Sequence, residues 1–339
     1  MIFGGLITAT LGWRWVFDIN VPIGIIVSLL SAKYISSNTT GLTHENKQQQ
    51  RHHLDIFGAV LITAGLMLLV YSLTSAQNTG IGSVQTLELL LLSVIILASF
   101  LLIEYRSKAP LMPLGFLRRG SIFGANAVGL LQVGPFVGMV FILTDYLQQV
   151  RGYSALYAGL AFIPMGIVFL VISVFLSARL VNRFGVKPII ISGMALQTIG
   201  YILLSPISLT ESYFGGLLLP TLLVGVGTGL SFTAINIAAL TGTRRGEEGL
   251  ASGLVNTSRQ IGGPIGLAIL LTVANFETPH PPGQLAIQSS AVMALVNGFG
   301  YAFLGAALLT AIGIIFTALL IDQKHRQATV MAATVHQGS

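Results

Sequence analysis

The sequence predicts an all-α, polytopic membrane protein, a bundle of helices that cross a bilayer. Hydrophobic residues make up 53% of its 339 residues and charged residues only 8%, whereas soluble domains average about 25% charged residues. Long apolar runs, each close to the ~20 residues that a membrane-spanning helix needs, are separated by short polar connections. None of the runs alternates as barrel strands do, so helices are the structures expected to satisfy the backbone in lipid.

The apolar runs divide the chain into nine complete spans and one stub. The stub covers residues 1–10 and comes first. Each later run is long enough to cross a core of ~30 Å as a helix. The complete spans are predicted at residues 16–36, 56–75, 84–104, 121–146, 155–177, 188–206, 212–240, 249–275 and 290–321.

The basic connection between residues 178 and 188 sets the predicted orientation. It carries Arg179, Arg183 and Lys187, and we interpret it as a short cytoplasmic loop because cytoplasmic loops are enriched in Lys and Arg. When the spans alternate from this point, nearly all of the 17 Lys and Arg residues fall on the same side. The exceptions are Arg14, Arg151 and Arg259. This asymmetry predicts a bacterial-type plasma membrane protein with a cytoplasmic C-terminus.

Other classes of function find little support in the sequence. The net charge of +6 is spread over the connections, without the basic stripe that nucleic-acid binding needs. The chain has no Cys, which excludes disulfides and thiol chemistry. His44, His52 and His53 lie in a polar segment with no ordered fourth ligand, so neither a metal nor a cofactor is expected. No span holds a metal cluster or paired carboxylates, so the sequence does not favour a membrane-embedded enzyme.

Five segments resemble the fourteen-span drug:proton antiporters of the major facilitator superfamily. Gly4-Gly5-Leu6, followed by WRWVFDINVPIG at residues 13–24, resembles the end of the fifth helix and the start of the sixth. The remaining segments resemble the start of the seventh helix, the loop after the eighth, the ninth-to-tenth connection and the thirteenth helix. They lie at residues 55–58, 104–110, 146–164 and 249–263.

The resemblance implies a major facilitator fold that lacks its first four to five helices. The family's antiporter signature resembles Gly-Pro-x-x-Gly-Gly, and Gly4 and Gly5 are its final pair here. The expected organisation is a remnant of the N-terminal six-helix half at 1–36, a cytoplasmic linker at 37–54, two linker transmembrane helices with a loop at 55–120, a C-terminal six-helix transport half at 121–322 and a cytoplasmic tail at 323–339.

The resemblance also implies a secondary transporter that exports hydrophobic or cationic small molecules in exchange for protons, by alternating access. Its partners would be the small-molecule substrate, protons and the lipid bilayer, with the missing N-terminal half supplied by the same or a separate chain. The alternatives are a non-functional truncated fragment, a half-transporter that needs a partner chain, or a major facilitator exporter of another solute.

The basic connection resembles the second copy of the superfamily's cytoplasmic gate motif, Gly-x-Leu-x-Asp-Arg-x-Gly-Arg-Lys. Leu180, Arg183, Gly185 and Lys187 match it, and Asn182 replaces the acidic residue. Without that Asp, a charge latch here should be weaker than in the complete motif. A purely topogenic basic loop is the alternative reading.

Arg259 is the main candidate for chemistry inside the membrane. It falls roughly 13 Å into a ~30 Å core, where a charge is costly and faces a cavity or a partner. Asn256 shares its helix face and Gln260 lies beside it. We interpret this face as a wall of the transport cavity, with Arg259 binding an anionic group or repelling a proton-bearing partner. Alternatively, Arg259 ties helices together through carbonyls or snorkels to the inner surface.

Other polar residues and several glycines extend these predictions. Asn236 is a further cavity candidate, and Asn126 and Gln132 are weaker ones because residues six apart cannot share a helix face. Glycines at four-residue spacing favour close helix packing, which would also permit the rocking of rigid halves. The glycines of this helix-packing group are Gly4, Gly5, Gly225, Gly229, Gly262, Gly263 and Gly266.

Asp18 is the candidate for proton coupling, because no acidic residue lies at mid-membrane in the predicted spans. It falls near the outer end of the span at 16–36, four residues after Arg14. An i, i+4 ion pair with Arg14 at the membrane interface is the alternative explanation.

Overall fold

The structure is a computed structural model in which the regular elements are helices. It describes residues 12, 14–34, 56–79, 83–106, 116, 119–210, 212–241, 243, 247–275 and 288–321. Within these ranges no strand occurs, as the apolar runs predict. Six helical stretches in the same ranges are long and apolar enough to cross a membrane. They are Val84–Arg106, Gly120–Val150, Ala155–Phe184, Val186–Leu204, Tyr213–Thr241 and Val292–Leu320.

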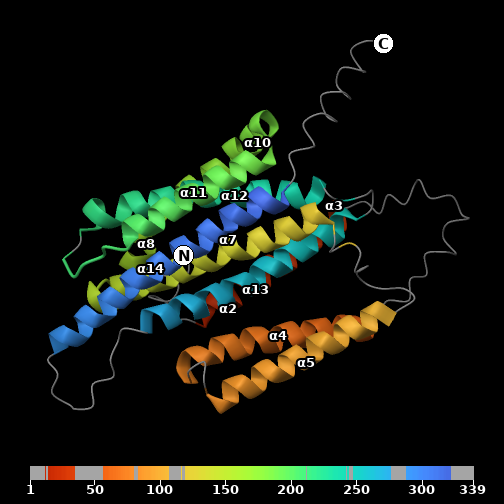
Figure 1. The fold of residues 1–339 in the computed structure, drawn as a ribbon, viewed down its shortest axis with the longest axis horizontal. Helices are drawn as coiled ribbons and strands as arrows, with labels where there is room; N and C mark the ends of the chain where they lie inside the picture. The colour runs from red at the N-terminus through yellow and green to blue at the C-terminus, as the bar shows by residue number, and fades with distance from the viewer. Residues whose placement is uncertain are drawn as a thin grey trace, which may run out of the picture.

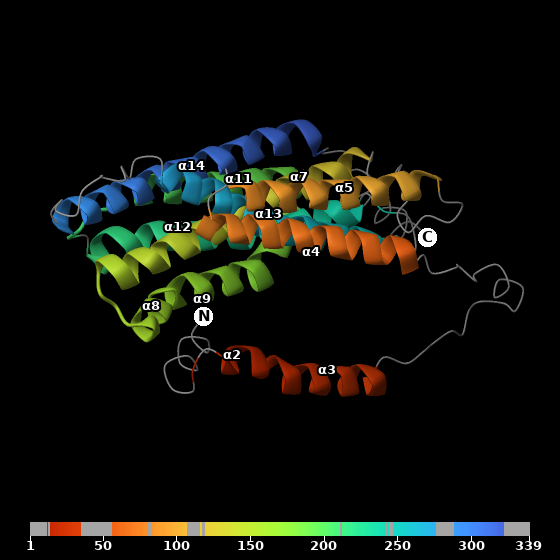
Figure 2. The ribbon, with the colours of Figure 1, turned by 90° about the horizontal axis from the view of Figure 1, so that it is seen from below.

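The first part of the chain forms two helical pairs. Their elements are α2 (Trp15–Asp18), α3 (Asn20–Tyr34), α4 (Ile56–Thr79) and α5 (Val84–Arg106). Helices α4 and α5 pack as a hairpin, in which the Ser93 hydroxyl donates to the Gly65 carbonyl at 3.1 Å. Helices α2 and α3 lie apart from the other helices (Figure 2), and all described side chains of α3 from residue 20 to 30 are exposed.

From residue 119 on, the described residues form six helical rods, which lie side by side as a bundle (Figure 1). The first rod consists of α7 (Gly120–Asp145) and η2 (Tyr146–Val150), and the second of α8 (Ala155–Ala161), α9 (Ile163–Val171), η3 (Ile172–Ser177) and α10 (Ala178–Phe184). The third rod is α11 (Val186–Leu204), and the fourth consists of η4 (Tyr213–Leu217) and α12 (Leu218–Thr241). The last two rods are α13 (Glu248–Asn275) and α14 (Gln288–Leu320). Helix α7 packs on α13, α12 and α14, while α11 packs between α12 and α14. The hairpin of α4 and α5 contacts the bundle through α13.

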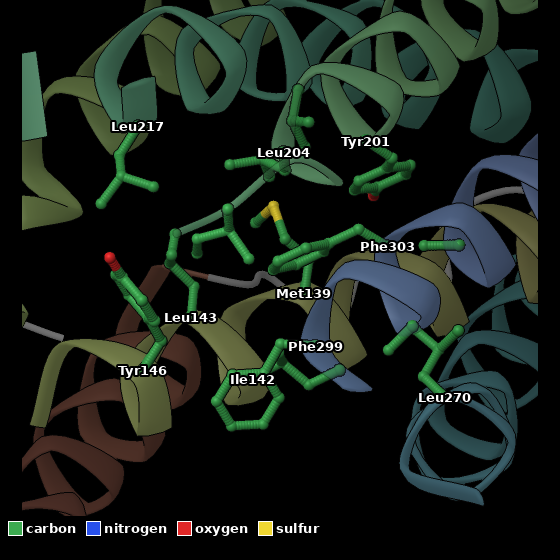
Figure 3. Close-up of a cluster of buried hydrophobic side chains, with 14 of the residues drawn as sticks. Met139, Ile142, Leu143, Tyr146, Tyr201, Leu204, Leu217, Leu270, Phe299 and Phe303 are labelled. Atoms are coloured by element: carbon green, nitrogen blue, oxygen red, sulfur yellow. The ribbon is translucent and has the colours of Figure 1, made fainter. Parts of the chain in front are cut away.

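An aromatic core fills the bundle where α7, α11 and α14 meet (Figure 3). Tyr146, Tyr201 and Phe303 are fully buried there. The Tyr146 hydroxyl donates to the Ser208 carbonyl at 2.6 Å, so its polar end is satisfied inside an apolar cluster. This core stabilises the end of the bundle at which η2 lies.

The predicted span at 155–177 is one helical rod with an interruption near its start. Helix α8 ends at Ala161, Phe162 has φ −87° and ψ −6°, and α9 begins at Ile163. Pro164 lies in the first turn of α9, where the missing N–H and the fixed φ of proline are tolerated. Pro164 therefore explains the position of the break.

The basic connection at 178–188 is not the loop that the sequence predicts. Residues Ala178–Phe184 form α10, which continues the preceding rod, and only Gly185 separates it from α11. Gly185 has φ +93°, a conformation that glycine adopts without a steric penalty. The expectation of a loop was wrong because Arg179 and Arg183 lie on the exposed side of α10 while Val181 on its other side is buried against the bundle, so the basic residues do not end the helix.

The residues of the gate-like motif surround this Gly185 turn. Leu180 packs against a buried cluster of the bundle, and the Arg183 guanidinium lies 5.3 Å from the centroid of the Phe184 ring. The Lys187 ammonium donates to the Ala318 carbonyl at 2.6 Å. Ala318 lies in the last turn of α14, where a cation satisfies a free carbonyl and offsets the helix dipole.

Glycines bring α7 and α13 into backbone contact. A Cβ on Gly134 would lie 2.8 Å from the Gly262 carbonyl oxygen, and a Cβ on Gly262 would lie 2.8 Å from the Leu130 carbonyl oxygen. A Cβ on Gly266 would overlap the backbone of Gly134 itself. Gly263 is different, because its nearest neighbour is the Val137 side chain at an ordinary 3.4 Å.

Two other glycines of the predicted packing group join α12 to the rod that contains α9. A Cβ on Gly225 would lie 2.9 Å from the Met165 carbonyl oxygen, and one on Gly229 would lie 3.0 Å from the Phe169 carbonyl oxygen. Gly4 and Gly5 fall outside the residues that the structure describes.

One ion pair connects the N-terminal ends of α7 and α13. The Arg119 guanidinium contacts the Glu247 carboxylate through two hydrogen bonds, of 2.5 and 3.1 Å. The hydrogen bond to Glu247 raises the pKa of Arg119 above its ordinary value, so the arginine stays charged at every physiological pH. Both side chains remain about 30% accessible, at 31% and 28%.

We expect reversal of one charge in this pair to lower the melting temperature slightly, because water and salt screen an exposed pair. Arg119→Glu should be the less stable variant, and Arg119→Glu combined with Glu247→Arg should regain most of the loss. Melting of purified protein at low and high salt measures this effect. A double variant no more stable than the single one would show that the ion pair does not stabilise this end of the bundle.

Candidate substrate-binding site

Arg259 lies deep within α13 and is buried. It is about 17 Å from the start of a helix that is about 42 Å long, and only 7% of the residue is exposed. Its side chain points toward α12 and α7, where glycines keep the neighbouring backbone close. Arg259 thus lies in the middle part of α13, but α13 is not among the six stretches that are long and apolar enough to cross a membrane, so the expected mid-membrane depth of this charge stays a prediction.

The partners of the Arg259 guanidinium come from α12. Its Nη1 donates to Oδ1 of Asn236 at 3.0 Å, and its Nη2 donates to the Phe232 carbonyl at 2.9 Å. The guanidinium carbon lies 4.0 Å from the centroid of the Phe232 ring, a cation–π distance. The Asn236 amide nitrogen also donates to the Phe232 carbonyl, at 3.1 Å, which orients its oxygen toward Arg259.

A second pair of polar side chains lies next to Arg259, between α13 and α7. The Ser258 hydroxyl donates to Oδ1 of Asn126 at 2.7 Å, and the Asn126 amide nitrogen donates to the Ile122 carbonyl at 2.7 Å. Gly129 lies one turn after Asn126, on the side of α7 that approaches Arg259. We define the Arg259 cluster as Asn126, Phe232, Asn236, Ser258 and Arg259.

The charge of the Arg259 cluster is not neutralised by the residues that the structure describes. In those ranges the one ion pair is that of Arg119 with Glu247, far along α7 and α13 from Arg259. The Nε–H of Arg259 is buried and has no hydrogen-bond acceptor there. A buried charge normally has a partner of opposite sign, and the described residues supply none to Arg259.

Asn256 and Gln260 lie on a different face of α13 from Arg259. Both are exposed, and both line a pocket of about 630 Å³ between α13 and α4. This volume is within the range of small-molecule pockets. The remaining lining residues are Leu66, Met67, Val70, Tyr71, Thr257 and Ile261. The structure therefore separates residues that the sequence places together.

Gln132 is fully buried within α7, and neither atom of its amide has a hydrogen-bond partner among the described residues. A similar but partly satisfied residue is Gln197 on α11, whose amide nitrogen donates to the Ser231 hydroxyl at 3.0 Å. Neither glutamine forms a hydrogen bond with the Arg259 cluster in the described part of the chain. Gln132 is thus a separate polar position in the bundle.

Asp18 lies at the end of α2 and is exposed. Helices α2 and α3 lie apart from the bundle (Figure 2), so the structure does not bring Asp18 together with the Arg259 cluster. The three histidines weighed as metal ligands, His44, His52 and His53, fall outside the described residues. Within the described ranges, no group of three or more metal-ligating side chains occurs.

Sequence reasoning identified three members of the Arg259 cluster as cavity candidates, namely Arg259, Asn236 and Asn126. It did not identify Ser258 or Phe232 as partners of that site. The available signal for Ser258 was its position next to Arg259 in the sequence, and that for Phe232 was its place one turn before Asn236. Which carbonyl and which amide face Arg259 depends on the packing of α12 against α13, which no local pattern specifies.

A helical bundle with several helices long and apolar enough to cross a membrane is the architecture of a multi-pass membrane protein. Comparison with known proteins agrees: the sequence profile of the Major Facilitator Superfamily matches residues 1–267. The chain belongs to the Major Facilitator Superfamily. It is therefore a multi-pass membrane protein of a transporter family and not an enzyme, as its sequence predicts.

Several relatives are exporters or resistance proteins by name. The chain is 34% identical to the cephamycin export protein of Amycolatopsis lactamdurans, over 91% of this chain and 60% of that protein. It is 32% identical to the puromycin resistance protein of Streptomyces alboniger, over 97% and 64%. It is 31% identical to the multidrug resistance protein Stp of Mycobacterium tuberculosis, over 80% and 48%. The chain thus spans about half to two thirds of the length of these relatives.

Proposed function

We propose that the chain acts in a fourteen-span drug:proton antiporter that exports hydrophobic or cationic small molecules by alternating access. The observation that carries this proposal is the match of residues 1–267 to the Major Facilitator Superfamily. The Arg259 cluster adds a buried polar position inside the helical bundle. Antibiotic export and multidrug resistance in the names of its relatives support the substrate class. The positive-inside pattern supports a plasma membrane location with a cytoplasmic C-terminus.

The glycine contacts support the alternating-access part of the proposal. Because α7 and α13 touch through Gly134, Gly262 and Gly266, these two helices are expected to move as one rigid unit. Alternating access in this superfamily is largely the rocking of such units around a central site. The residues 121–322 are accordingly proposed as the transport unit, with residues 55–120 as linker helices.

Dye export from everted membrane vesicles tests the proposal. We expect vesicles that contain the protein to take up ethidium when a proton gradient is applied, and to stop when an uncoupler removes it. The 339-residue chain and the longest reading frame that contains it should be compared. Transport by neither would contradict an export function, and transport by the longer form alone would assign the activity to an assembly that needs further helices.

Asp18 is the proposed proton-coupling carboxylate. Asp18→Asn removes its titratable group, so we expect export to lose its acceleration by a proton gradient while the protein is still inserted in the membrane. Glu88→Gln is a matched control, since Glu88 is also exposed and lies in a membrane helix, α5. Unchanged acceleration in Asp18→Asn would exclude Asp18 and leave the ion pair with Arg14 as its explanation.

A further inference from the structure

The pocket of about 630 Å³ lies between α4 of the hairpin and α13 of the bundle, which run side by side (Figure 1). Its volume is within the range of pockets that bind small molecules. Each helix contributes four lining residues at the spacing i, i+1, i+4 and i+5, beginning at Leu66 in α4 and at Asn256 in α13. Residues at this spacing share one helix face. The pocket is therefore the space between two facing helix surfaces.

Both helices are held in place by faces that do not line the pocket. On α4, a Cβ at Gly65 would lie 2.7 Å from the Leu97 side chain of α5, and the Ser93 hydroxyl of α5 donates to the Gly65 carbonyl. On α13, the face that contains Arg259 and Gly266 packs against α12 and α7. A ligand in the pocket therefore meets two walls that the rest of the protein already positions.

The two walls differ in chemistry. Helix α4 offers Met67 and Tyr71, which are 69% and 59% exposed, so a molecule can reach both from outside the bundle. Helix α13 offers the amides of Asn256 and Gln260, and neither forms a hydrogen bond with the residues that the structure describes. An amide in apolar surroundings is costly without such a partner, so a ligand that supplies one gains affinity.

The pocket also tolerates a positive charge on its ligand. None of its lining residues is charged, so no Lys or Arg there repels a cation. The guanidinium of Arg259 is directed to the Phe232 carbonyl and to Asn236 on α12, on the other side of α13. The side-chain oxygens of Asn256 and Gln260 are hydrogen-bond acceptors, and the ring of Tyr71 attracts cations through its face.

We propose that this pocket binds a planar aromatic cation that carries amino groups. Its rings pack on Met67 and Tyr71, because thioethers and aromatic side chains make favourable contacts with aromatic rings. Its N–H groups donate to the side-chain oxygens of Asn256 and Gln260. The inference rests on the proposed export function and narrows it to one class of substrate at one place. It also makes α4 a wall of a binding site and not only a linker.

Two probes test the preference for amino groups. Ethidium carries amino groups on a planar cationic ring system, and the ethylphenylphenanthridinium cation is the same molecule without them. Equilibrium dialysis measures the binding of each probe to the purified full chain in phosphatidylcholine nanodiscs, with binding to empty nanodiscs subtracted. We expect ethidium to bind about 10-fold more tightly, the effect of a hydrogen bond from a charged group. Equal affinities, or tighter binding of the analogue, would overturn the proposal.

A double variant locates this preference on α13. Asn256→Leu combined with Gln260→Met removes both amides and keeps side chains of similar size. Both positions are exposed, so the fold should persist. The ratio of the two affinities should fall to about one, with the affinity for the analogue unchanged. Gln85→Met is the matched control, because Gln85 is an exposed glutamine of α5 outside the pocket. An unchanged ratio in the double variant, or an equal loss in Gln85→Met, would overturn the assignment.

Tyr71→Ala tests whether α4 forms the second wall. Both probes should bind roughly 10-fold more weakly, with their ratio unchanged, because both lose the same aromatic contact. Tyr105→Ala should leave both affinities at their wild-type values, since Tyr105 is an exposed tyrosine of α5 outside the pocket. Wild-type affinities in Tyr71→Ala would show that α4 is not part of the site, and would overturn the proposal.

A lipid in the pocket and a failure of the export function give different results. Binding of both probes no greater than to empty nanodiscs would mean that lipid acyl chains occupy the pocket, and would overturn the proposal. Dye export from vesicles is measured independently of these affinities. The expected ethidium preference without dye export would contradict the export function alone, and dye export with equal affinities for the two probes would contradict this inference alone.

Discussion

Replacement of Gly266 by alanine is expected to lower the free energy of unfolding by roughly 3 kcal/mol, at the upper end of the usual cost of overpacking. The added Cβ would overlap the backbone of Gly134 on α7, so no side chain can rotate to make room. The two helices must separate, and this separation would break the neighbouring contact of Gly262 with Leu130 as well. Unfolding of the purified protein in detergent measures the change in the free energy of unfolding. The fraction that remains monodisperse after heating, measured by size-exclusion chromatography, provides a second comparison of the variant with the wild type.

Gly253→Ala is the matched control for this prediction. Gly253 lies in the same helix, α13, and a Cβ added there would have no neighbouring atom within 4 Å. Here alanine should stabilise the protein by a few tenths to about 1 kcal/mol through its higher helix propensity. Equal stability of Gly266→Ala and Gly253→Ala would show that α7 and α13 do not touch at Gly134.

The second large effect is expected from Asn236→Ala, which should cost about 1.5 to 3 kcal/mol, the range for a lost hydrogen bond to a charged group. Asn236 supplies the acceptor for Nη1 of Arg259 at 3.0 Å. Its removal leaves a buried cation with one fewer partner, and a buried cation cannot recover that partner from water. Denaturation of the purified variant in detergent or nanodiscs tests this expectation.

Two further variants make the Asn236 prediction specific. Asn256→Ala changes the same residue type on α13, but its side chain is exposed, so we expect a change within about 0.5 kcal/mol. Asn236→Asp keeps an acceptor for Nη1 of Arg259 and adds a charge of opposite sign, so it should lose less stability than Asn236→Ala. If Asn236→Ala were as stable as Asn256→Ala, the hydrogen bond to Arg259 would not contribute to the fold.

The helices of this protein could be predicted from sequence because hydropathy and length are local properties. The span predicted at 249–275 is helical from Glu248 to Asn275, and that predicted at 188–206 is helical from Val186 to Leu204. The π-helical segments, such as η3 within the second rod of the bundle, were not predicted. They depend on how neighbouring helices pack, and no residue type marks them.

The candidate site was only partly predictable, for a geometric reason. Asn256 and Arg259 are three residues apart, so at about 100° per residue their side chains point in directions only about 60° apart around the axis of α13. The boundary between the buried face and the exposed face of the helix runs between them. A sequence pattern cannot locate that boundary. In the structure, Arg259 shares the buried face with Val255, Gly262 and Gly266, whereas Asn256 and Gln260 face α4.

The contact of Gly134 with Gly266 has a consequence for how the sequence can evolve. When an enlarged residue presses on a side chain, a later mutation can shorten that side chain and restore the fit. Gly138 is such a position, because the atoms nearest to its Cβ would be those of the Leu270 side chain, which a smaller residue could replace. Gly134 and Gly266 oppose each other with no side-chain atoms to remove. A substitution at either one has no compensating substitution at the other, so we expect both positions to be retained as glycine.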